Sequence, residues 1–204
     1  EPAKEMIIAE ITSELSKQSV QVTGLVERIA QTGGPTIFVI SDGTGTLALK
    51  GFEGPGERAH PEIEEGDVIK SIIIVEEFKG ELEGDIKKIS KLSDKEHETY
   101  LQKILDTQRD RAKIEPVPFL VKSPILDKLK DLFEKAATEI RLAIFQNRPI
   151  IVRHHNDTDG YSAGFALERA ILPLINKEHS SEKAGWEFFL RAPCAAPFYE
   201  IDDS

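Results

Sequence analysis

The sequence has very little cysteine, because Cys194 is the only one among 204 residues. A single cysteine excludes a disulfide within the chain and a zinc site built from several cysteines. This usage is typical of intracellular proteins, so we expect a cytoplasmic location. Long apolar runs are also missing, since no stretch approaches the roughly 18 residues of a membrane span. We therefore expect no association with a membrane.

Basic residues are outnumbered, with 26 Lys and Arg against 36 Asp and Glu and a net charge of −10. This balance excludes a uniformly basic surface of the kind that binds duplex DNA. It does not exclude nucleic acid, because carboxylates gathered around divalent cations also count as negative. The hydrophobic share of 40% is enough for a packed core, and the length allows one large domain or two small ones.

A complete glycine-rich phosphate loop is absent as well. The run Gly43-Thr44-Gly45 is not followed by Gly-Lys-Ser/Thr, and no G-x-G-x-x-G pattern is completed. We interpret this run as a hairpin turn, in which the Asp42-Gly43 pair supplies a positive φ.

What the first half does contain is a series of short strands rich in branched and aromatic residues. The predicted strands cover residues 20–29, 35–40, 46–52, 68–75 and 82–89. The first is long enough to bend at Gly24. Five strands with a longer connector between the third and fourth match the Greek-key barrel called the OB-fold. The runs "VISDGTGTLALKGF" and "EEGDVIKSIIIVEEF" resemble the OB modules of single-strand-binding proteins.

An OB barrel binds single strands by stacking bases on aromatic rings and by tracking phosphates with basic side chains. The candidates for such contacts are Phe38, Lys50, Phe52 and Lys70, with Phe78 as a further aromatic residue. Two interpretations stay open for each of them. Phe38 can simply fill the barrel, the others can be solvated surface residues, and the acidic surroundings allow the barrel to dock protein instead.

Two helices follow the strands. Ser93 with Glu96 three residues later predicts a capped helix to about Lys113, and its charged surface suits a bridge between domains. Pro124 in the first turn begins a second helix of about 23 residues with an apolar stripe, which ends before Asn147.

The stretch "IIVRHHNDTDGYSAG" at residues 150–164 gathers polar side chains directly after a predicted buried strand. A helix is predicted from Gly160, so these side chains lie at the carboxyl end of a strand, where ligands bind in open α/β sheets. His155, Asp157 and Asp159 alternate and would project to one side of an extended backbone. One imidazole and two carboxylates suit Mn²⁺, and Mg²⁺ to a lesser degree.

Two neighbouring residues complete this hypothesis. Gly160 permits a sharp turn into the helix, and Ser162 either contacts a phosphate oxygen or caps the helix. The alternative is a polar loop without a ligand, in which Asp159 caps the helix.

The same stretch resembles motif I of the DHH phosphoesterase superfamily, His-x-Asp-x-Asp-Gly. An OB module before such a domain is similar to the archaeal RecJ-related proteins. The resemblance implies hydrolysis of phosphodiesters with two Mn²⁺ (or Mg²⁺) ions. His155 and Asp157 would hold one ion, and Asp159 would reach the second or bridge both, which makes these three the implied catalytic residues.

The sequence departs from that family pattern in one respect. The tripeptide Asp-His-His and the later motifs do not occur in it, and the chain starts at Glu1-Pro2. We therefore expect an excerpt, inactive by itself, of an active parent protein.

Residues after the second predicted helix carry weaker signals. Residues 187–190 predict the next strand, Trp186 is interpreted as core and His179 as an exposed loop residue. His154 is expected to point away from His155 and to hydrogen-bond behind the ligands.

These signals give a domain plan. Residues 1–93 form an OB-fold domain, 94–122 a helical linker, and 123–204 the truncated start of an α/β DHH domain with a parallel sheet. The predicted function is an exonuclease or phosphodiesterase of single-stranded DNA or RNA, with replication or repair proteins as further partners. One alternative is a non-catalytic binding module of that machinery. The other is a phosphodiesterase of small nucleotides, in which the barrel holds no substrate.

Overall fold

A computed structural model of the protein describes residues 3–78, 80–179 and 184–195. The chain folds into two compact units, Glu1–Gln108 and Arg109–Ser204. Each has its own apolar core. The expected fold class is confirmed, because a closed barrel is followed by helices and a small parallel sheet. The predicted domain boundaries at residues 93 and 122 stay predictions. In the described part of the chain, no helix is long and apolar enough to cross a membrane.

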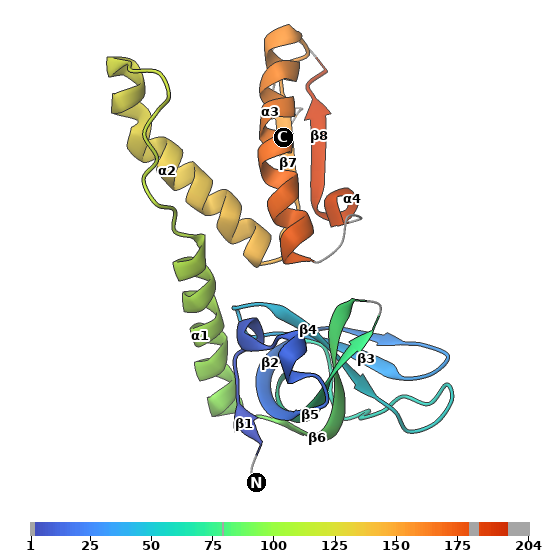
Figure 1. Ribbon diagram of the computed structural model, residues 1–204. Helices are drawn as coiled ribbons and strands as arrows, with labels where there is room; N and C mark the ends of the chain where they lie inside the picture. The colour runs from blue at the N-terminus through green and yellow to red at the C-terminus, as the bar shows by residue number, and fades with distance from the viewer. Residues whose placement is uncertain (1–2, 79, 180–183, 196–204) are drawn as a thin grey trace. The chain divides into compact units, whose positions relative to one another are not determined.

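The first unit is a barrel of five strands, β2 to β6 (Figure 1). Antiparallel pairs join β2 to β3, β3 to β4 and β5 to β6, while β4 and β6 are parallel and β5 returns to β2. The strands are β2 Ser19–Gln31, β3 Thr36–Ser41, β4 Thr46–Gly51, β5 Val68–Phe78 and β6 Glu81–Lys91.

Strand β2 belongs to both sides of the barrel. Its first half pairs with β5 and its second half with β3, and the change of partner falls at Leu25. A side chain on the preceding Gly24 would place Cβ 3.1 Å from both Ile40 Cδ1 and the Ser41 oxygen. Gly24 therefore lies where β2 passes closely over β3, whereas the register shift of β2 against β3 falls between Val26 and Arg28, so the bend at Gly24 stays a prediction.

Alternate residues of the strands fill the barrel, as the period of two requires. The core residues with no exposed surface are Val22, Phe38, Ile40, Leu49, Ile69, Ile73 and Val75.

An amino-terminal segment closes over one end of this core. It consists of β1 (Lys4–Glu5), which pairs with β2, and two short 3-10 helices, η1 (Ile8–Glu10) and η2 (Ser13–Leu15). The buried Asp42 carboxylate accepts hydrogen bonds from the backbone of Ile8 at 2.8 Å and of Thr44 at 2.8 Å. Gly43 has φ +83°, so the interpretation of its run as a turn is confirmed.

Helix α1 (Asp94–Ala112) begins at the predicted cap. The Ser93 hydroxyl donates to Glu96 Oε2 at 2.5 Å, and the Ser93 amide donates to the same oxygen at 3.1 Å. Tyr100 donates its hydroxyl hydrogen to the Thr23 carbonyl at 2.8 Å, which fastens the helix to the barrel.

The second unit packs helices against a two-stranded parallel sheet of β7 and β8, with register from Ile150 beside Phe189 to His154 beside Pro193. Its core gathers Ile144, Phe145, Ile171 and Ile175. The elements are α2 Pro124–Phe145, β7 Ile150–His154, α3 Thr158–Glu178, α4 Ala184–Phe188 and β8 Phe189–Pro193.

Two predictions for residues 186–190 are wrong in detail. The last strand begins at Phe189, because residues 184–188 form one short helix in which Gly185 packs closely on Leu172. Trp186 is 91% exposed on that helix and does not belong to the core.

Candidate functional site

Of the candidate ligand residues, His155 and Asp157 lie on the connection between β7 and α3, and Asp159 lies in the first turn of α3; residues 155–160 are called the β7–α3 loop. Helix α3 begins at Thr158, two residues before the predicted start, and Asp157 is its N-cap. The Asp157 carboxylate accepts a hydrogen bond from the Gly160 amide at 2.8 Å. The Tyr161 amide donates to the Asp157 carbonyl at 3.0 Å. The alternative that Asp159 caps the helix is wrong, because Asp157 occupies that position.

The three predicted ligands are all exposed in this loop, at His155, Asp157 and Asp159. One imidazole and two carboxylates fit the ligand preferences of Mn²⁺. Within residues 3–78, 80–179 and 184–195, however, no three His, Cys, Asp or Glu side chains converge closely enough to hold a metal ion. The donor types therefore suit a divalent cation, but a closed coordination shell is not formed by this part of the chain. The metal-binding and catalytic assignments stay predictions.

The space around position 160 accepts only glycine. A Cβ at this position would lie 2.2 Å from the His155 carbonyl oxygen, a distance that no side chain tolerates. Ser162 is exposed, and its hydroxyl donates to the Thr158 carbonyl at 2.8 Å within the helix. Ser162 therefore does not cap the helix. Contact of Gly160 and Ser162 with a phosphate stays a prediction, although the first N–H groups of a helix attract anions.

His154 and His155 point to opposite sides, as expected. His155 is exposed, whereas His154 is buried and its Nδ1 lies 2.7 Å from the His155 carbonyl oxygen. The Cys194 amide donates to the His154 carbonyl at 2.8 Å, which ties the end of β7 to the residue after β8.

Sequence reasoning missed the side chains that pack behind the loop. Tyr161 meets the ring of His154 edge-on, with 4.8 Å between ring centroids. Arg191 lies 6.0 Å from the Tyr161 ring and donates to Glu168 at 2.6 Å. A single sequence offers no local signal for this group, because Arg191 and Glu168 are brought together only by the packing of β8 on α3.

The barrel residues proposed for nucleic acid differ in their accessibility. Phe38 as a nucleic-acid contact is wrong, because its ring is 0% exposed inside the barrel and presents no face to a base. Lys50 forms an ion pair with Glu83 and lies 4.8 Å above the Phe78 ring. Phe52 is 63% exposed directly after β4, and Lys70 is exposed on β5. Roles for Lys50, Phe52 and Lys70 stay predictions.

Asp67 and His179 are among the titratable groups outside the loop whose pKa values are shifted. Burial alone raises the pKa of Asp67, but hydrogen bonds from Lys91 and the Glu64 amide outweigh it, so this pKa lies below its ordinary value. Burial lowers the pKa of His179, whose ring stacks on Phe188 with 4.1 Å between centroids. The expectation of an exposed His179 is wrong, because this stacking half-buries it.

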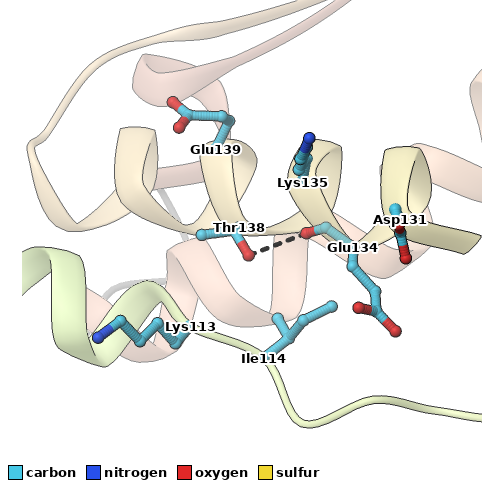
Figure 2. A pocket seen from close by; sticks show the side chains of 7 residues that line it. All are labelled: Lys113, Ile114, Asp131, Glu134, Lys135, Thr138 and Glu139. Atoms are coloured by element: carbon cyan, nitrogen blue, oxygen red, sulfur yellow. Dashed lines mark hydrogen bonds between the residues drawn. The ribbon is translucent and has the colours of Figure 1, made fainter.

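A groove of about 430 Å³ lies elsewhere in the second unit, against α2 (Figure 2). Its charges are of both signs, and the Thr138 hydroxyl is used within the helix, donating to the Glu134 carbonyl at 2.9 Å. The groove contains none of the predicted site residues, so we place the candidate site at the β7–α3 loop instead. Its lining residues are Lys113, Ile114, Asp131, Glu134, Lys135, Thr138 and Glu139.

Comparisons with known proteins agree with the two parts of the fold. The family described as the OB-fold nucleic acid binding domain matches residues 20–92. The chain is 44% identical over 193 residues to uncharacterized protein MJ1198 of Methanocaldococcus jannaschii, covering 93% of this chain and 25% of that protein. The chain thus spans about a quarter of the length of its curated relative.

A solved structure is also similar. It is described as the DHH domain of a member of a family of ribosomal proteins, with 50% identity, a TM-score of 0.52, and coverage of 54% of this chain and 25% of that one. The resemblance inferred from sequence, an OB-fold domain joined to part of a DHH domain, is confirmed at this level.

Proposed function

We propose that this chain is part of a metal-dependent phosphodiesterase that cleaves single-stranded nucleic acid, as a RecJ-like exonuclease does. The observation that carries the proposal is the β7–α3 loop. It presents one imidazole and two carboxylates between the carboxyl end of a parallel strand and the amino terminus of a 21-residue helix. The similarity to a protein described as a DHH domain supports it.

Each loop residue has a distinct task in this proposal. His155 and Asp157 would hold one divalent ion, and Asp159 would help to hold a second. Bound Mn²⁺ or Mg²⁺ supplies an activated water and neutralises charge that develops on the phosphate. The amino terminus of α3 attracts a phosphate oxygen through the partial positive charge of its N–H groups, and Gly160 lets the backbone approach it. Further ligands come from outside the described residues, since no three donors converge within them.

The barrel has the task of holding the strand. Exposed Phe52 is available to stack on a base, and Lys70 to approach a phosphate. The match of residues 20–92 to a nucleic-acid-binding family supports this assignment. Lys50 contributes less, because it already pairs with Glu83.

The decisive variant is Asp157→Asn in a protein that carries this chain at the length of its curated relative. Asparagine is as good an N-cap as aspartate, so its side-chain oxygen still accepts from the Gly160 amide while the charge is lost. We expect Mn²⁺-dependent hydrolysis of a labelled single-stranded oligonucleotide to disappear in this variant.

The matched control is Asp131→Asn, which removes one exposed aspartate from α2 and should leave hydrolysis unchanged. Full activity of Asp157→Asn would overturn the metal site. Strand binding without hydrolysis by the unsubstituted protein would favour the alternative of a non-catalytic binding module. Hydrolysis of dinucleotides alone would favour the small-nucleotide phosphodiesterase.

A further inference from the structure

The side chain of His154 lies behind the β7–α3 loop and is not one of its proposed ligands. It is only 7% exposed, although it directly precedes the exposed His155. Burial of an imidazole costs free energy unless its nitrogens find partners, so its contacts indicate what it does.

One ring nitrogen holds the backbone of the first ligand. His154 Nδ1 lies 2.7 Å from the His155 carbonyl oxygen. A carbonyl oxygen only accepts, so Nδ1 carries the proton and donates it. The His154 carbonyl in turn accepts from the Cys194 amide at 2.8 Å. Both the side chain and the backbone of His154 are therefore fastened where the strand ends.

The His155 carbonyl is confined from its other side. The Cα of Gly160 faces it so closely that a Cβ would lie 2.2 Å from the oxygen. The His155–Asn156 peptide is thus held between the His154 imidazole and the first turn of α3. Its orientation sets the direction in which the His155 side chain leaves the backbone.

The ring of His154 has little freedom to move. A Cβ on Gly164 would lie 2.6 Å from His154 Cδ2, so only glycine at that position leaves room for the imidazole. The edge-on contact with Tyr161 confines the ring further.

We infer that His154 is a positioning residue, whose Nδ1–H fixes the His155 peptide and so aims the proposed ligands His155 and Asp157. This inference deepens the proposed function and rests on it for the identity of the bound ion. The contact that it assigns to the loop can be tested without any ion.

The second ring nitrogen makes a rival possibility testable. With Nδ1 protonated, Nε2 carries a lone pair, and among the described residues it is buried without a hydrogen-bond partner. If Nε2 held the loop in its conformation instead, for example by a hydrogen bond through a bound water, then a different set of substitutions would keep that conformation.

Three variants of the 204-residue chain distinguish a role of His154 Nδ1 from a role of Nε2. His154→Asn places an amide donor near the position of Nδ1, His154→Gln places one near Nε2, and His154→Phe keeps a ring without either nitrogen. The readouts are the affinity for Mn²⁺ alone, from the electron paramagnetic resonance signal of the free ion, and hydrogen exchange at the Gly160 and Tyr161 amides.

We expect His154→Phe and His154→Gln to weaken Mn²⁺ binding about 10- to 100-fold, the usual effect of losing a residue that orients a ligand. Exchange at the Gly160 and Tyr161 amides should accelerate in both. His154→Asn should restore both readouts to within about twofold of the unsubstituted chain, which a merely space-filling role would not produce. Unchanged exchange at α2 amides checks that each variant is folded.

Three results would overturn the inference. The first is that both readouts are unchanged in all three variants. The second is that His154→Gln, and not His154→Asn, keeps the values of the unsubstituted chain. The third is that His154→Asn and His154→Phe lose Mn²⁺ affinity and exchange protection equally. If the unsubstituted chain binds no Mn²⁺, binding requires the further ligands that we place outside the described residues. The exchange rates then still decide whether His154 fixes the peptide. A His154→Phe variant that does not fold leaves the comparison of Asn with Gln to decide.

Discussion

At the scale of single residues, Gly160 lies directly against the His155 carbonyl in the candidate loop. The contact leaves no room for even one methyl group, since a Cβ would lie 2.2 Å from the oxygen. The positions of the His155 peptide and of the first turn of α3 are therefore coupled. A substitution at Gly160 must move one of them.

We predict that Gly160→Ala destabilises the second unit by about 1–3 kcal/mol, the range for a forced steric clash. Alanine is otherwise the better helix former, so a purely local effect would have the opposite sign. The measurement is chemical denaturation followed by circular dichroism. Gly33→Ala is the control, because a Cβ there meets nothing within 4 Å. A Gly160→Ala variant as stable as the unsubstituted chain would contradict the packing described.

Asp157 allows a second prediction at this scale. Asp157→Ala removes the N-cap of α3 and should lower the free energy of unfolding by about 1 kcal/mol, whereas Asp157→Asn should change it by a few tenths at most. Thermal unfolding of the two variants side by side measures the difference. Equal losses in both would show that the charge, and not the cap, stabilises the helix.

Some residue-level features were predictable from the sequence and others were not. Gly160 and the opposed directions of His154 and His155 follow from the order of residues alone. Phe38 shows the limit, because the period of two separates the faces of a strand but does not say which face is inside. The cap was missed because Asp157, Thr158 and Asp159 are all residues that cap helices, and only the backbone decides among them.

At the scale of elements, Asp67 joins the connector before β5 to the end of β6. Its carboxylate accepts from the Glu64 amide at 2.9 Å and pairs with Lys91 at 2.6 Å. Together these contacts outweigh the opposing effect of burial and lower its pKa below the ordinary value of 3.8. The interaction therefore depends on an ionised carboxylate.

The lowered pKa of Asp67 determines how the stability of the barrel depends on pH. A carboxyl group with a lowered folded-state pKa stabilises the fold above its unfolded-state pKa, and this contribution is lost as the pH falls through the folded-state value. We expect Asp67→Asn to cost about 1–2 kcal/mol at pH 7, since Lys91 is half exposed, and to cost progressively less as the pH falls below the ordinary value of 3.8. Urea unfolding of the barrel across this range measures it. Glu53→Gln, at an exposed residue shortly after β4, is the control.

Elements were predictable where they were long or bounded by clear turns. The five barrel strands, the capping box of α1 and the length of α2 follow from periodicity and turn residues. The five-residue helix α4 was missed, because one turn is too short to display a helical period. Its residues Trp186 and Phe188, with Phe189 after them, are locally typical of a strand.

At the scale of the whole molecule, the acidic balance of the chain limits how it can hold a nucleic acid. With a net charge of −10, phosphate attraction is confined to a few basic side chains, and stacking must supply much of the affinity. We expect binding of a single-stranded oligonucleotide to weaken with salt at a logarithmic slope of only about −1 to −2.

Within that binding, Phe52→Ala should weaken affinity by about 1–3 kcal/mol, the value of one stacked base. Fluorescence anisotropy of a labelled oligonucleotide measures both this loss and the salt slope. Substitution of Thr46 by alanine, an exposed position on β4, is the control. A slope steeper than about −4 would point to a basic surface that the barrel candidates do not supply.

Strand β2 pairs with both β3 and β5, and this has a consequence for folding during synthesis. Strand β2 is made before β5, and half of its backbone pairs only with β5, at separations from 43 residues (Leu25 beside Val68) to 55 residues (Ser19 beside Ile74). Pairings so distant in sequence form slowly, and until then the strand carries an open edge. During synthesis, strands β2, β3 and β4 can therefore pair before β5 and β6 are available, and the barrel stays open until those two strands are added.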